Sequence, residues 1–416
     1  MIRCINTPAE ANTLPLTAIS ATGTKPGSSC APELSDLRLG SPISRDLALR
    51  LIHCTDGDLP DLLAAARAAK ENFKPGVITY SRKVFLPLTN LCRDYCGYCT
   101  FRRDPGEPGA HTMTPEEVLT VARAGEKLGC TEALFSLGDK PELLFPEMRD
   151  TLRHLGYKST MHYLEAMCEL VLRETSLLPH PNPGLLSAEW IARLAAFSPS
   201  IGLMLETVNP SLLAPGAAHD NAPDKAPGKR LRTIEEAGKQ RVPFTTGLLI
   251  GIGETLEDRV DTLLAIRDLH DRYGHVQEVI IQNFRAKPTI PMANSPEPSQ
   301  GEMLRTVAVA RLLMPKVNIQ APPNLNAPYY EELLDAGIND WGGISPLTPD
   351  YINPEKPWPH LEQLRLRTEG KGFQLRQRLP AYPEFLSGLM SRPGLLTERL
   401  QAATGGDGLA KETRAA

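Results

Sequence analysis

Three cysteines within eight residues are the feature of this sequence that most clearly predicts chemistry: Cys92-Arg-Asp-Tyr-Cys96-Gly-Tyr-Cys99. Three thiolates this close converge on one site only if the chain loops around something. Iron–sulfur clusters are held by thiolates and most take four, so three ligands leave one iron open for another molecule. The remaining cysteines are isolated and form no second triplet: Cys4, Cys30, Cys54, Cys130 and Cys168.

Two other interpretations of the triplet stay open from the residues alone. A structural zinc site can combine the three thiolates with His111, although zinc ligand pairs are usually separated by longer loops. A disulfide would pair only two of the three cysteines. We also expect the protein to be in the cytoplasm, where reducing conditions disfavour disulfides. An iron–sulfur centre is therefore favoured over zinc, and zinc over a disulfide.

Other candidate site residues stand at the ends of apolar runs. Ser136, Gly138 and Asp139 follow one such run, and Glu206 ends another. A charged residue that closes an apolar strand is expensive to bury, so a functional role is favoured over a structural one for Glu206. For the other three, a tight turn at the end of a strand is the structural alternative.

These residues need a scaffold in which strand ends meet. Short apolar runs alternate with helical patterns, and Thr114-Pro-Glu-Glu117 and Thr255-Leu-Glu-Asp258 carry the capping residues of helix starts. The runs that read as buried strands are 84–88, 133–137, 176–180, 201–206, 244–250, 276–283, 317–321 and 340–344. Eight strand–helix units predict an α/β fold, a closed (βα)8 TIM-type barrel with reactive groups on the loops after the strands.

An open, doubly wound sheet is the competing architecture. Its dinucleotide-binding form carries a glycine fingerprint in a turn between a strand and a helix. Gly251-Ile-Gly-Glu-Thr-Leu256 is the glycine-rich turn of this sequence, and it has Leu where the third glycine belongs. The barrel is therefore favoured.

Composition limits the classes of function. The 416 residues carry 45 Lys and Arg against 49 Asp and Glu, a formal charge of −4, and 41% are hydrophobic. These values are typical of a globular protein. The small negative net charge provides no positive electrostatic potential that would attract nucleic acid or anionic membranes non-specifically. No apolar stretch approaches the ~20 residues that span a bilayer.

The chain divides into three expected segments. Residues 1–45 are rich in Ser, Thr, Pro and Gly without a hydrophobic period, which predicts a flexible N-terminal extension. Residues 46–360 would form the barrel. Residues 361–416 would form a C-terminal helical segment with a tail that is loose beyond Asp407.

The cysteine triplet, with Tyr98 just before its last member, resembles the signature of the radical S-adenosylmethionine (SAM) superfamily. The resemblance implies one [4Fe–4S] cluster per chain, held by Cys92, Cys96 and Cys99, with its open iron binding SAM. One electron would cleave SAM to methionine and a 5′-deoxyadenosyl radical, which takes hydrogen from a substrate. The SAM contacts that it implies are Tyr98, Ser136, Gly138, Asp139, Glu206 and Gly251.

Over about residues 83–359 the sequence resembles more narrowly the cyclising subunits of deazaflavin (FO) synthases. The order of several strings carries this resemblance, among them Cys96-Gly-Tyr-Cys-Thr-Phe-Arg-Arg103, Leu178-Pro-His-Pro-Asn-Pro-Gly184 and Asn339-Asp-Trp-Gly-Gly343. It implies a lyase of coenzyme F420 biosynthesis. Such a lyase converts 5-amino-5-(4-hydroxybenzyl)-6-(D-ribitylimino)-dihydrouracil to 7,8-didemethyl-8-hydroxy-5-deazariboflavin (FO) with loss of ammonia.

The same resemblance implies two partners, a companion radical SAM subunit that couples tyrosine and an external one-electron donor. Three alternatives remain: that companion itself, a menaquinone-pathway radical SAM enzyme, and, from another class, a zinc-stabilised binding module. A substrate with a polyol tail and a uracil edge requires amide and hydroxyl partners. The candidates for these contacts are Gln282, Asn283, Asn324, Asn326, Asp340 and Trp341, and Lys287 and His180 are candidates for moving protons.

Overall fold

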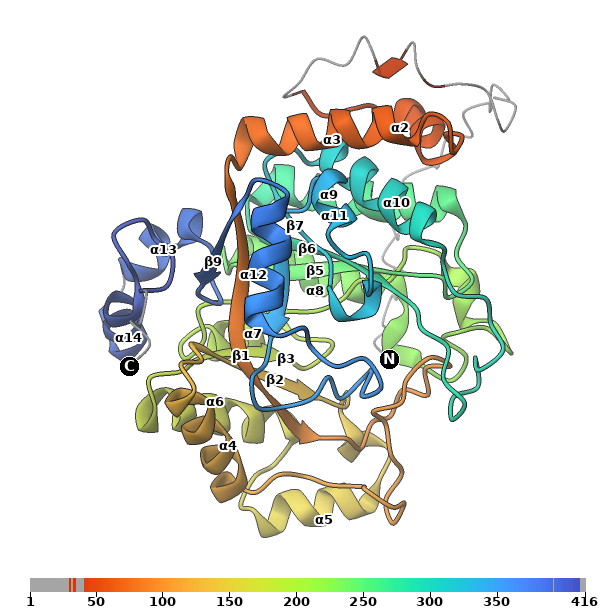
Figure 1. Cartoon of the computed structure of the whole chain (residues 1–416). Coiled ribbons are helices and arrows are strands. Elements are labelled where there is room, and N and C mark those ends of the chain that lie inside the picture. The colour runs from red at the N-terminus through yellow and green to blue at the C-terminus, as the bar shows by residue number, and fades with distance from the viewer. Residues whose placement is uncertain (1–29, 31–32, 35–40, 392, 412–416) are drawn as a thin grey trace, which may run out of the picture.

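The computed structural model describes residues 30, 33–34, 41–391 and 393–411 (Figure 1). Most of the extension predicted for residues 1–45 lies outside this part of the chain. Its described residues pack on the rest of the protein, since Cys30 and Ile43 are buried. The backbone N–H of Ile43 also donates to the carbonyl of Leu312 over 3.3 Å.

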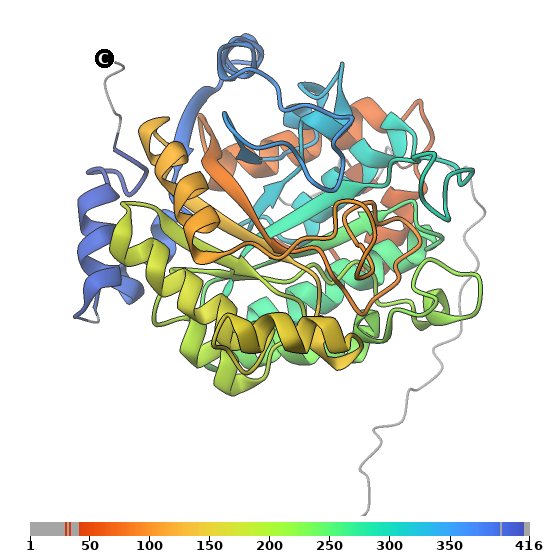
Figure 2. The same ribbon diagram turned by 90° about the horizontal axis from the view of Figure 1, so that it is seen from below.

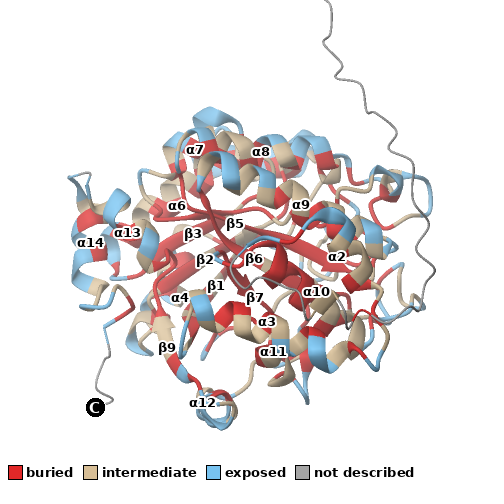
Figure 3. Ribbon diagram, turned by 90° about the horizontal axis from the view of Figure 1, so that it is seen from above, coloured by how far each residue is buried: buried red, intermediate tan, exposed pale blue. Residues whose placement is uncertain are grey.

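Eight parallel strands surround a central lumen in the order β3-β2-β1-β8-β7-β6-β5-β4. Their bounds are Val77–Thr89 (β1), Glu132–Leu137 (β2), Leu178–Asn182 (β3), Ile201–Gly202 (β4), Phe244–Ile250 (β5), Val276–Asn283 (β6), Asn318–Gln320 (β7) and Asp340–Ile344 (β8). Figure 3 shows these buried strands inside a ring of helices with exposed outer faces. The predicted barrel is thus confirmed, and the open sheet was the wrong alternative.

The helices that follow the strands cover the outside of the barrel. The helices before and between the first strands are Arg45–Ile52 (α2), Leu59–Phe73 (α3), Pro115–Lys127 (α4), Pro146–His154 (α5), Thr160–Glu174 (α6) and Ala188–Leu194 (α7). The later ones are Pro227–Lys239 (α8), Leu256–Tyr273 (α9), Gln300–Leu313 (α10), Glu332–Asp335 (α11), Leu361–Gly370 (α12), Pro383–Met390 (α13) and Leu395–Ala403 (α14). Both predicted capping boxes are present, at Thr114 and Thr255. No helix in the described ranges is long and apolar enough to cross a membrane.

Strands β3 and β4 are the two ends of the hydrogen-bonded path, and they meet at a seam. The N–H of Leu178 donates over 2.9 Å to the carbonyl of the residue before β2. Because successive residues of a strand point to alternate neighbours, the ring nitrogens of Pro179 and Pro181 face the seam, where a missing N–H costs no ladder bond. A side-chain contact bridges the seam instead: Nδ1 of His180 lies 2.6 Å from Oγ of Ser200, which directly precedes β4.

Five strands have other limits than expected: β2, β3 and β7 differ by at most two residues at an end, and β1 and β4 by more. β1 begins at Val77, whereas the predicted strand began only after the polar Lys83. In the structure Lys83 belongs to the strand, faces the lumen and pairs with Glu132 of β2 over 2.7 Å. β4 covers two residues instead of 201–206, and beyond it the backbone contacts β5 irregularly. The N–H of Glu206 still donates to the carbonyl of Gly247 over 3.0 Å.

The C-terminal segment was only partly predicted. Residues 361–416 were expected to be helical, but Gln374–Arg378 forms a ninth strand, β9, parallel to the first half of β1. The expected loose tail is also wrong for residues 408–411. Ala410 is buried, and its N–H donates to the carbonyl of Gln377 over 3.1 Å.

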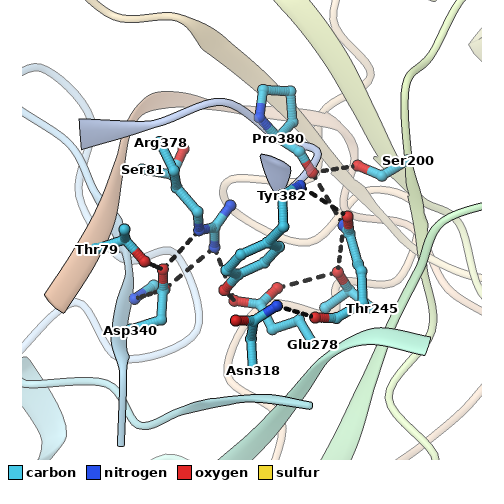
Figure 4. Close-up of polar contacts among 12 residues, drawn as sticks. Thr79, Ser81, Ser200, Thr245, Glu278, Asn318, Asp340, Arg378, Pro380 and Tyr382 are labelled. Carbon is cyan, nitrogen blue, oxygen red and sulfur yellow. Dashed lines mark hydrogen bonds and ion pairs between the residues drawn. The ribbon is translucent and has the colours of Figure 1, made fainter. Parts of the chain in front are cut away.

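Buried charges close the base of the barrel, at the end opposite the cysteine loop (Figure 4). Nε of Arg378, the last residue of β9, lies 2.6 Å from Oδ2 of Asp340, and its Nη2 lies 2.7 Å from Oε1 of Glu278. The hydroxyl of Tyr382 donates to the same Glu278 oxygen over 3.0 Å. Since all four side chains are buried and paired, the lumen is sealed at this end.

Candidate active site at the mouth of the barrel

The cysteine triplet lies on the loop after β1, where the parallel strands end. In Figure 2 this segment, in orange, lies in front of the strand ends. A cavity of about 260 Å³ opens beneath it. The predicted site residues that line this cavity are Cys92, Cys96, Cys99, Tyr98, Ser136, Gly138, Asp139 and Glu206. Sequence positions from three different strand ends are thus brought to one place.

The thiols of the loop suit metal ligation. Cys92, Cys96 and Cys99 form no disulfide. Burial raises the pKa of Cys92, while the backbone N–H bonds that its Sγ accepts from Asp94 over 3.4 Å and from Asp139 over 3.2 Å act in the opposite direction and favour a thiolate. Burial raises the pKa of Cys96 to about 12, so metal binding has to displace its proton.

The end of β2 is fitted closely to the cysteine loop. A Cβ on Gly138 would lie 1.9 Å from the carbonyl oxygen of Leu91, so only glycine allows this approach. The neighbouring Asp139 is buried, and its Oδ2 accepts the N–H of Leu185 over 3.1 Å. Burial raises the pKa of Asp139, while the ammonium of Lys140, 2.5 Å from Oδ1, acts in the opposite direction.

Glu206 is held in an uncommon backbone conformation, with φ at +67°. Its Oε1 lies 2.6 Å from Nζ of Lys225, and both side chains are largely buried. Burial lowers the pKa of Lys225, but the attraction of Glu206 outweighs it and the pKa is raised. Beside this pair, the hydroxyl of Tyr98 lies 3.1 Å from Nε2 of His219.

Sequence reasoning missed four basic residues of the cavity, and two of them, Lys225 and Arg230, belong to one segment; the others are Arg102 and Arg285. Nε of Arg230 donates to the carbonyl of Met204 over 2.7 Å, which holds the guanidinium at the cavity wall. Lys225 and Arg230 both lie near the start of α8, after an irregular segment without apolar periodicity. The basic run Lys225-Ala-Pro-Gly-Lys-Arg230 was the available signal.

Three buried aspartates tie the loop to its surroundings. One carboxylate oxygen each of Asp94, Asp139 and Asp224 lies within 4.8 Å of the others. The N–H of Asp224 donates to Oδ1 of Asp94 over 3.0 Å. Arg93 compensates part of the charge, with its Nε 3.2 Å from Oδ2 of Asp224. These contacts hold the cysteine loop, the end of β2 and the start of α8 together.

The structure does not place Gly251 with the other predicted residues, because it is not among the residues that line the cavity. Its φ is +91°, and a Cβ there would lie 2.5 Å from Cδ of Pro298. Turn geometry and packing therefore explain this glycine. His111, the fourth ligand of the zinc alternative, lies at a different cavity. Its Nε2 is 3.1 Å from a carboxylate oxygen of Glu117.

A second cavity of about 200 Å³ continues into the lumen. The residues that line both cavities are Ser136, Asn182, Met204, Gln282 and Ile352. The deeper walls are polar and charged, with side chains from several strands: Lys83, Glu132, His180, Thr245, Glu278, Gln320 and Arg378. Apolar side chains line it as well, among them Phe85, Leu134, Ile280 and Trp358, so the lumen is a mixed pocket with several charged groups below the mouth.

The residues predicted to contact substrate are divided between these cavities and the scaffold. Asn283 and Lys287 line the mouth cavity. Asn324 and Asn326 bond other loop groups, the former to Asp350 over 3.0 Å and the latter to the carbonyl of Pro322 over 2.8 Å. Asp340 belongs to the base, whereas Trp341 lines the inner cavity, and its indole N–H donates to Thr368 over 3.1 Å.

Comparison with known proteins identifies relatives of this chain. The family model described as the Radical SAM superfamily matches residues 86–266. The 7,8-didemethyl-8-hydroxy-5-deazariboflavin synthase of Methanopyrus kandleri is 49% identical over 310 residues, which are 74% of this chain and 93% of that protein. The FO synthase of Nocardia farcinica is 49% identical over 361 residues, 84% of this chain, but the chain spans only 42% of its length.

Solved structures show the same fold at low sequence identity. The FeFe-hydrogenase maturase HydG from Carboxydothermus hydrogenoformans superposes with a TM-score of 0.67 at 21% identity, covering 90% of this chain and 89% of that one. Methylornithine synthase PylB gives a TM-score of 0.65 at 17% identity, covering 87% of this chain and all of the other.

Proposed function

Because the chain belongs to the radical SAM superfamily and, within it, to the 7,8-didemethyl-8-hydroxy-5-deazariboflavin (FO) synthases, we propose that it catalyses the cyclising half of FO formation. The substrate would be 5-amino-5-(4-hydroxybenzyl)-6-(D-ribitylimino)-dihydrouracil, and the products FO and ammonia. A companion radical SAM subunit would supply this adduct by coupling tyrosine, and an external donor would supply single electrons.

The lengths of the relatives support the assignment to one half of the pathway. The chain spans 93% of the Methanopyrus protein and 97% of the corresponding Methanothermobacter protein, but 37–45% of the FO synthases compared. The sequence carries one cysteine triplet, which is enough for one radical SAM centre.

The mouth cavity has the groups that the cofactors of this family need. Cys92, Cys96 and Cys99 would hold a [4Fe–4S] cluster by three thiolates, and the fourth iron would be left for SAM. When bound, the two cofactors supply the hydrogen-abstracting radical. The residues that we propose as SAM contacts within the cavity are Tyr98, Ser136, Gly138, Asp139 and Glu206.

Two of these contacts, Asp139 and Glu206, have side chains that are already fixed in place. The carboxylate of Asp139 is buried and fixed by the N–H of Leu185, so it is positioned to accept a hydrogen bond from an ammonium group. Glu206 is fixed by Lys225 and would accept from ribose hydroxyls. Gly251 lies outside the lining, and we propose for it only an indirect role, in shaping the turn after β5.

The observation that carries this proposal is the continuity of the two cavities. A cofactor beneath the cysteine loop would face a substrate held in the lumen, away from water, and both conditions favour controlled radical chemistry. The polar groups of the lumen also suit a substrate with a polyol tail and a uracil edge.

Anaerobic incubation of the reconstituted protein with SAM and dithionite tests the proposal. With the preformed adduct, we expect 5′-deoxyadenosine and the fluorescence of a deazaflavin. In a parallel reaction, free tyrosine and the diaminouracil replace the adduct. Coupling in that reaction would instead identify the companion activity. A colourless protein that binds zinc and forms no 5′-deoxyadenosine would contradict any radical SAM function.

A further inference from the structure

His180 projects from β3 into the inner cavity, below the groups assigned to SAM. The side chain is 6% exposed, yet its two ring nitrogens have different surroundings. Nδ1 contacts Oγ of Ser200 over 2.6 Å. Within the described ranges, no hydrogen bond of the protein reaches Nε2, which lies beside Gly202 of β4.

The contacts of Ser200 fix which nitrogen carries the proton. Its hydroxyl donates to the carbonyl of Pro380 over 2.6 Å, a contact drawn in Figure 4, and a carbonyl can only accept. A hydroxyl has one proton, so Ser200 has none left to donate to His180. Nδ1 of His180 must therefore be the donor. In the neutral ring, Nε2 then carries a lone pair.

The charges around the ring keep it neutral. Burial, together with the cations Lys83 of β1 and Arg378 of β9, lowers the pKa of His180 to about 4, against the opposing effect of Glu132 of β2. Lys83 and Glu132 neutralise each other over 2.7 Å. The ring is thus unprotonated at neutral pH and can accept a proton, but its lowered pKa makes it a weaker base than a free imidazole.

Gly202 has no side chain, and Nε2 of His180 occupies the space that a side chain there would fill. A Cβ on Gly202 of β4 would lie 2.9 Å from Nε2 of His180, too close for the ring to stay in place. Residue 202 has no positive φ that requires glycine, so the close approach to the imidazole is the reason for this residue.

We propose that Nε2 of His180 is the proton acceptor in the loss of ammonia and acts on the substrate in the inner cavity. This inference rests on the proposed function and deepens it. Nε2 takes a proton from the substrate, and the electron pair of that bond forms a double bond as the C–N bond breaks. The electron pair of the C–N bond leaves with the amino nitrogen. The imidazolium returns the proton to that nitrogen, which departs as ammonia, and this elimination needs no oxidant.

His180→Asn is the sharpest test, because asparagine can keep an N–H donor near Ser200 but has no group at the position of Nε2. Loss of a general base costs about 10²–10⁴ in rate, so FO formation from the adduct should fall at least about 100-fold. Formation of 5′-deoxyadenosine should continue, which would also show that the variant folds and carries its cluster. A merely structural role of His180 would lower both products together.

His275→Gln is the matched control. His275 is also buried, but it lies at the start of β6 with its Nε2 2.8 Å from the carbonyl of Ile234, and it lines neither cavity. Both products should form at the wild-type rates. Equal loss of FO in this variant would assign the effect to burial of histidine in general and overturn the proposal.

Gly202→Ala provides a second test that keeps the imidazole, for the case that His180→Asn does not fold. It should lower FO formation while 5′-deoxyadenosine persists. If either variant forms FO at the wild-type rate, the proposed role of His180 is overturned, but the proposed function of the protein is not. A wild-type protein that makes 5′-deoxyadenosine but no FO from the adduct would instead refute the proposed function, and the inference with it.

Discussion

The backbone N–H of Asp139 donates to Sγ of Cys92 over 3.2 Å, and this bond joins the end of β2 to the cysteine loop. The contact needs a close approach of two backbones, which the absence of a side chain at Gly138 allows. The proposed iron ligand and the proposed contact for the ammonium group of SAM are therefore positioned by one and the same junction.

Gly138→Ala should disrupt this junction. Its Cβ would meet the carbonyl of Leu91 and Cβ of Cys92, and overpacking of this kind typically costs about 1–3 kcal/mol. We expect less iron per chain after anaerobic reconstitution and a lower midpoint of thermal unfolding. Gly388→Ala in α13, where a Cβ meets nothing within 4 Å, is the control and should keep the full iron content. Full iron content in Gly138→Ala would contradict the described fit.

Replacement of Cys92, Cys96 or Cys99 by alanine should abolish cluster binding and SAM cleavage. Each lies on a loop, so the barrel should still unfold in a single cooperative transition. The measurements are iron and sulfide content, 5′-deoxyadenosine formation and circular dichroism. Cys168→Ala, in α6 and outside both cavities, should keep iron and activity. A variant of the triplet with undiminished iron would remove that cysteine from the ligand set.

Glu206→Gln tests the buried pair with Lys225. Removal of one partner leaves an uncompensated buried charge, which typically costs about 3–5 kcal/mol. We expect a lower free energy of unfolding and a higher KM for SAM in 5′-deoxyadenosine formation. In Glu236→Gln, the exposed contact with Lys239 over 2.7 Å is lost instead, and both quantities should stay nearly unchanged. An unchanged KM in Glu206→Gln would argue against a SAM contact.

His275 should make the protein less stable in acid. Burial lowers its pKa from 6.5 to about 4. Between these values the unfolded chain holds a proton that the folded protein lacks, so the free energy of unfolding falls as the pH falls from 6.5 to 4. This difference in pKa lowers the free energy of unfolding by about 3 kcal/mol at pH 4.

Chemical unfolding at a series of pH values measures this effect. His275→Gln should lose less stability than the wild type over this interval, whereas His154→Gln, at an exposed position, should follow the wild type. Parallel curves for His275→Gln and the wild type would show that this ring does not titrate as described.

Sequence reasoning succeeded where the pattern is local. β5 and β6 match their predicted bounds residue for residue, because each is built around an apolar run, Leu-Leu-Ile in β5 and Val-Ile-Ile in β6. The predicted capping boxes at Thr114 and Thr255 also depend only on residues three apart. The cysteine loop was placed correctly after β1 for the same reason.

What was missed depends on contacts between distant residues. β9 has the sequence Gln-Leu-Arg-Gln-Arg, which shows little strand pattern, and Arg378 is fixed by Asp340 and Glu278, 38 and 100 positions away. The pairing of Lys225 with Glu206 likewise depends on how an irregular segment folds back over the mouth. Such contacts leave no periodic pattern in the sequence. From the sequence alone, charged residues that become buried therefore cannot be distinguished from charged residues that stay in solvent.

The sealed base around Arg378 has a kinetic consequence for an enzyme that takes two molecules. The lumen is blind-ended, so whatever occupies its deeper part must pass the cysteine loop before the outer part fills. Under the proposed function, the adduct would therefore have to bind before SAM. The fragments of SAM would then have to depart before the product could leave.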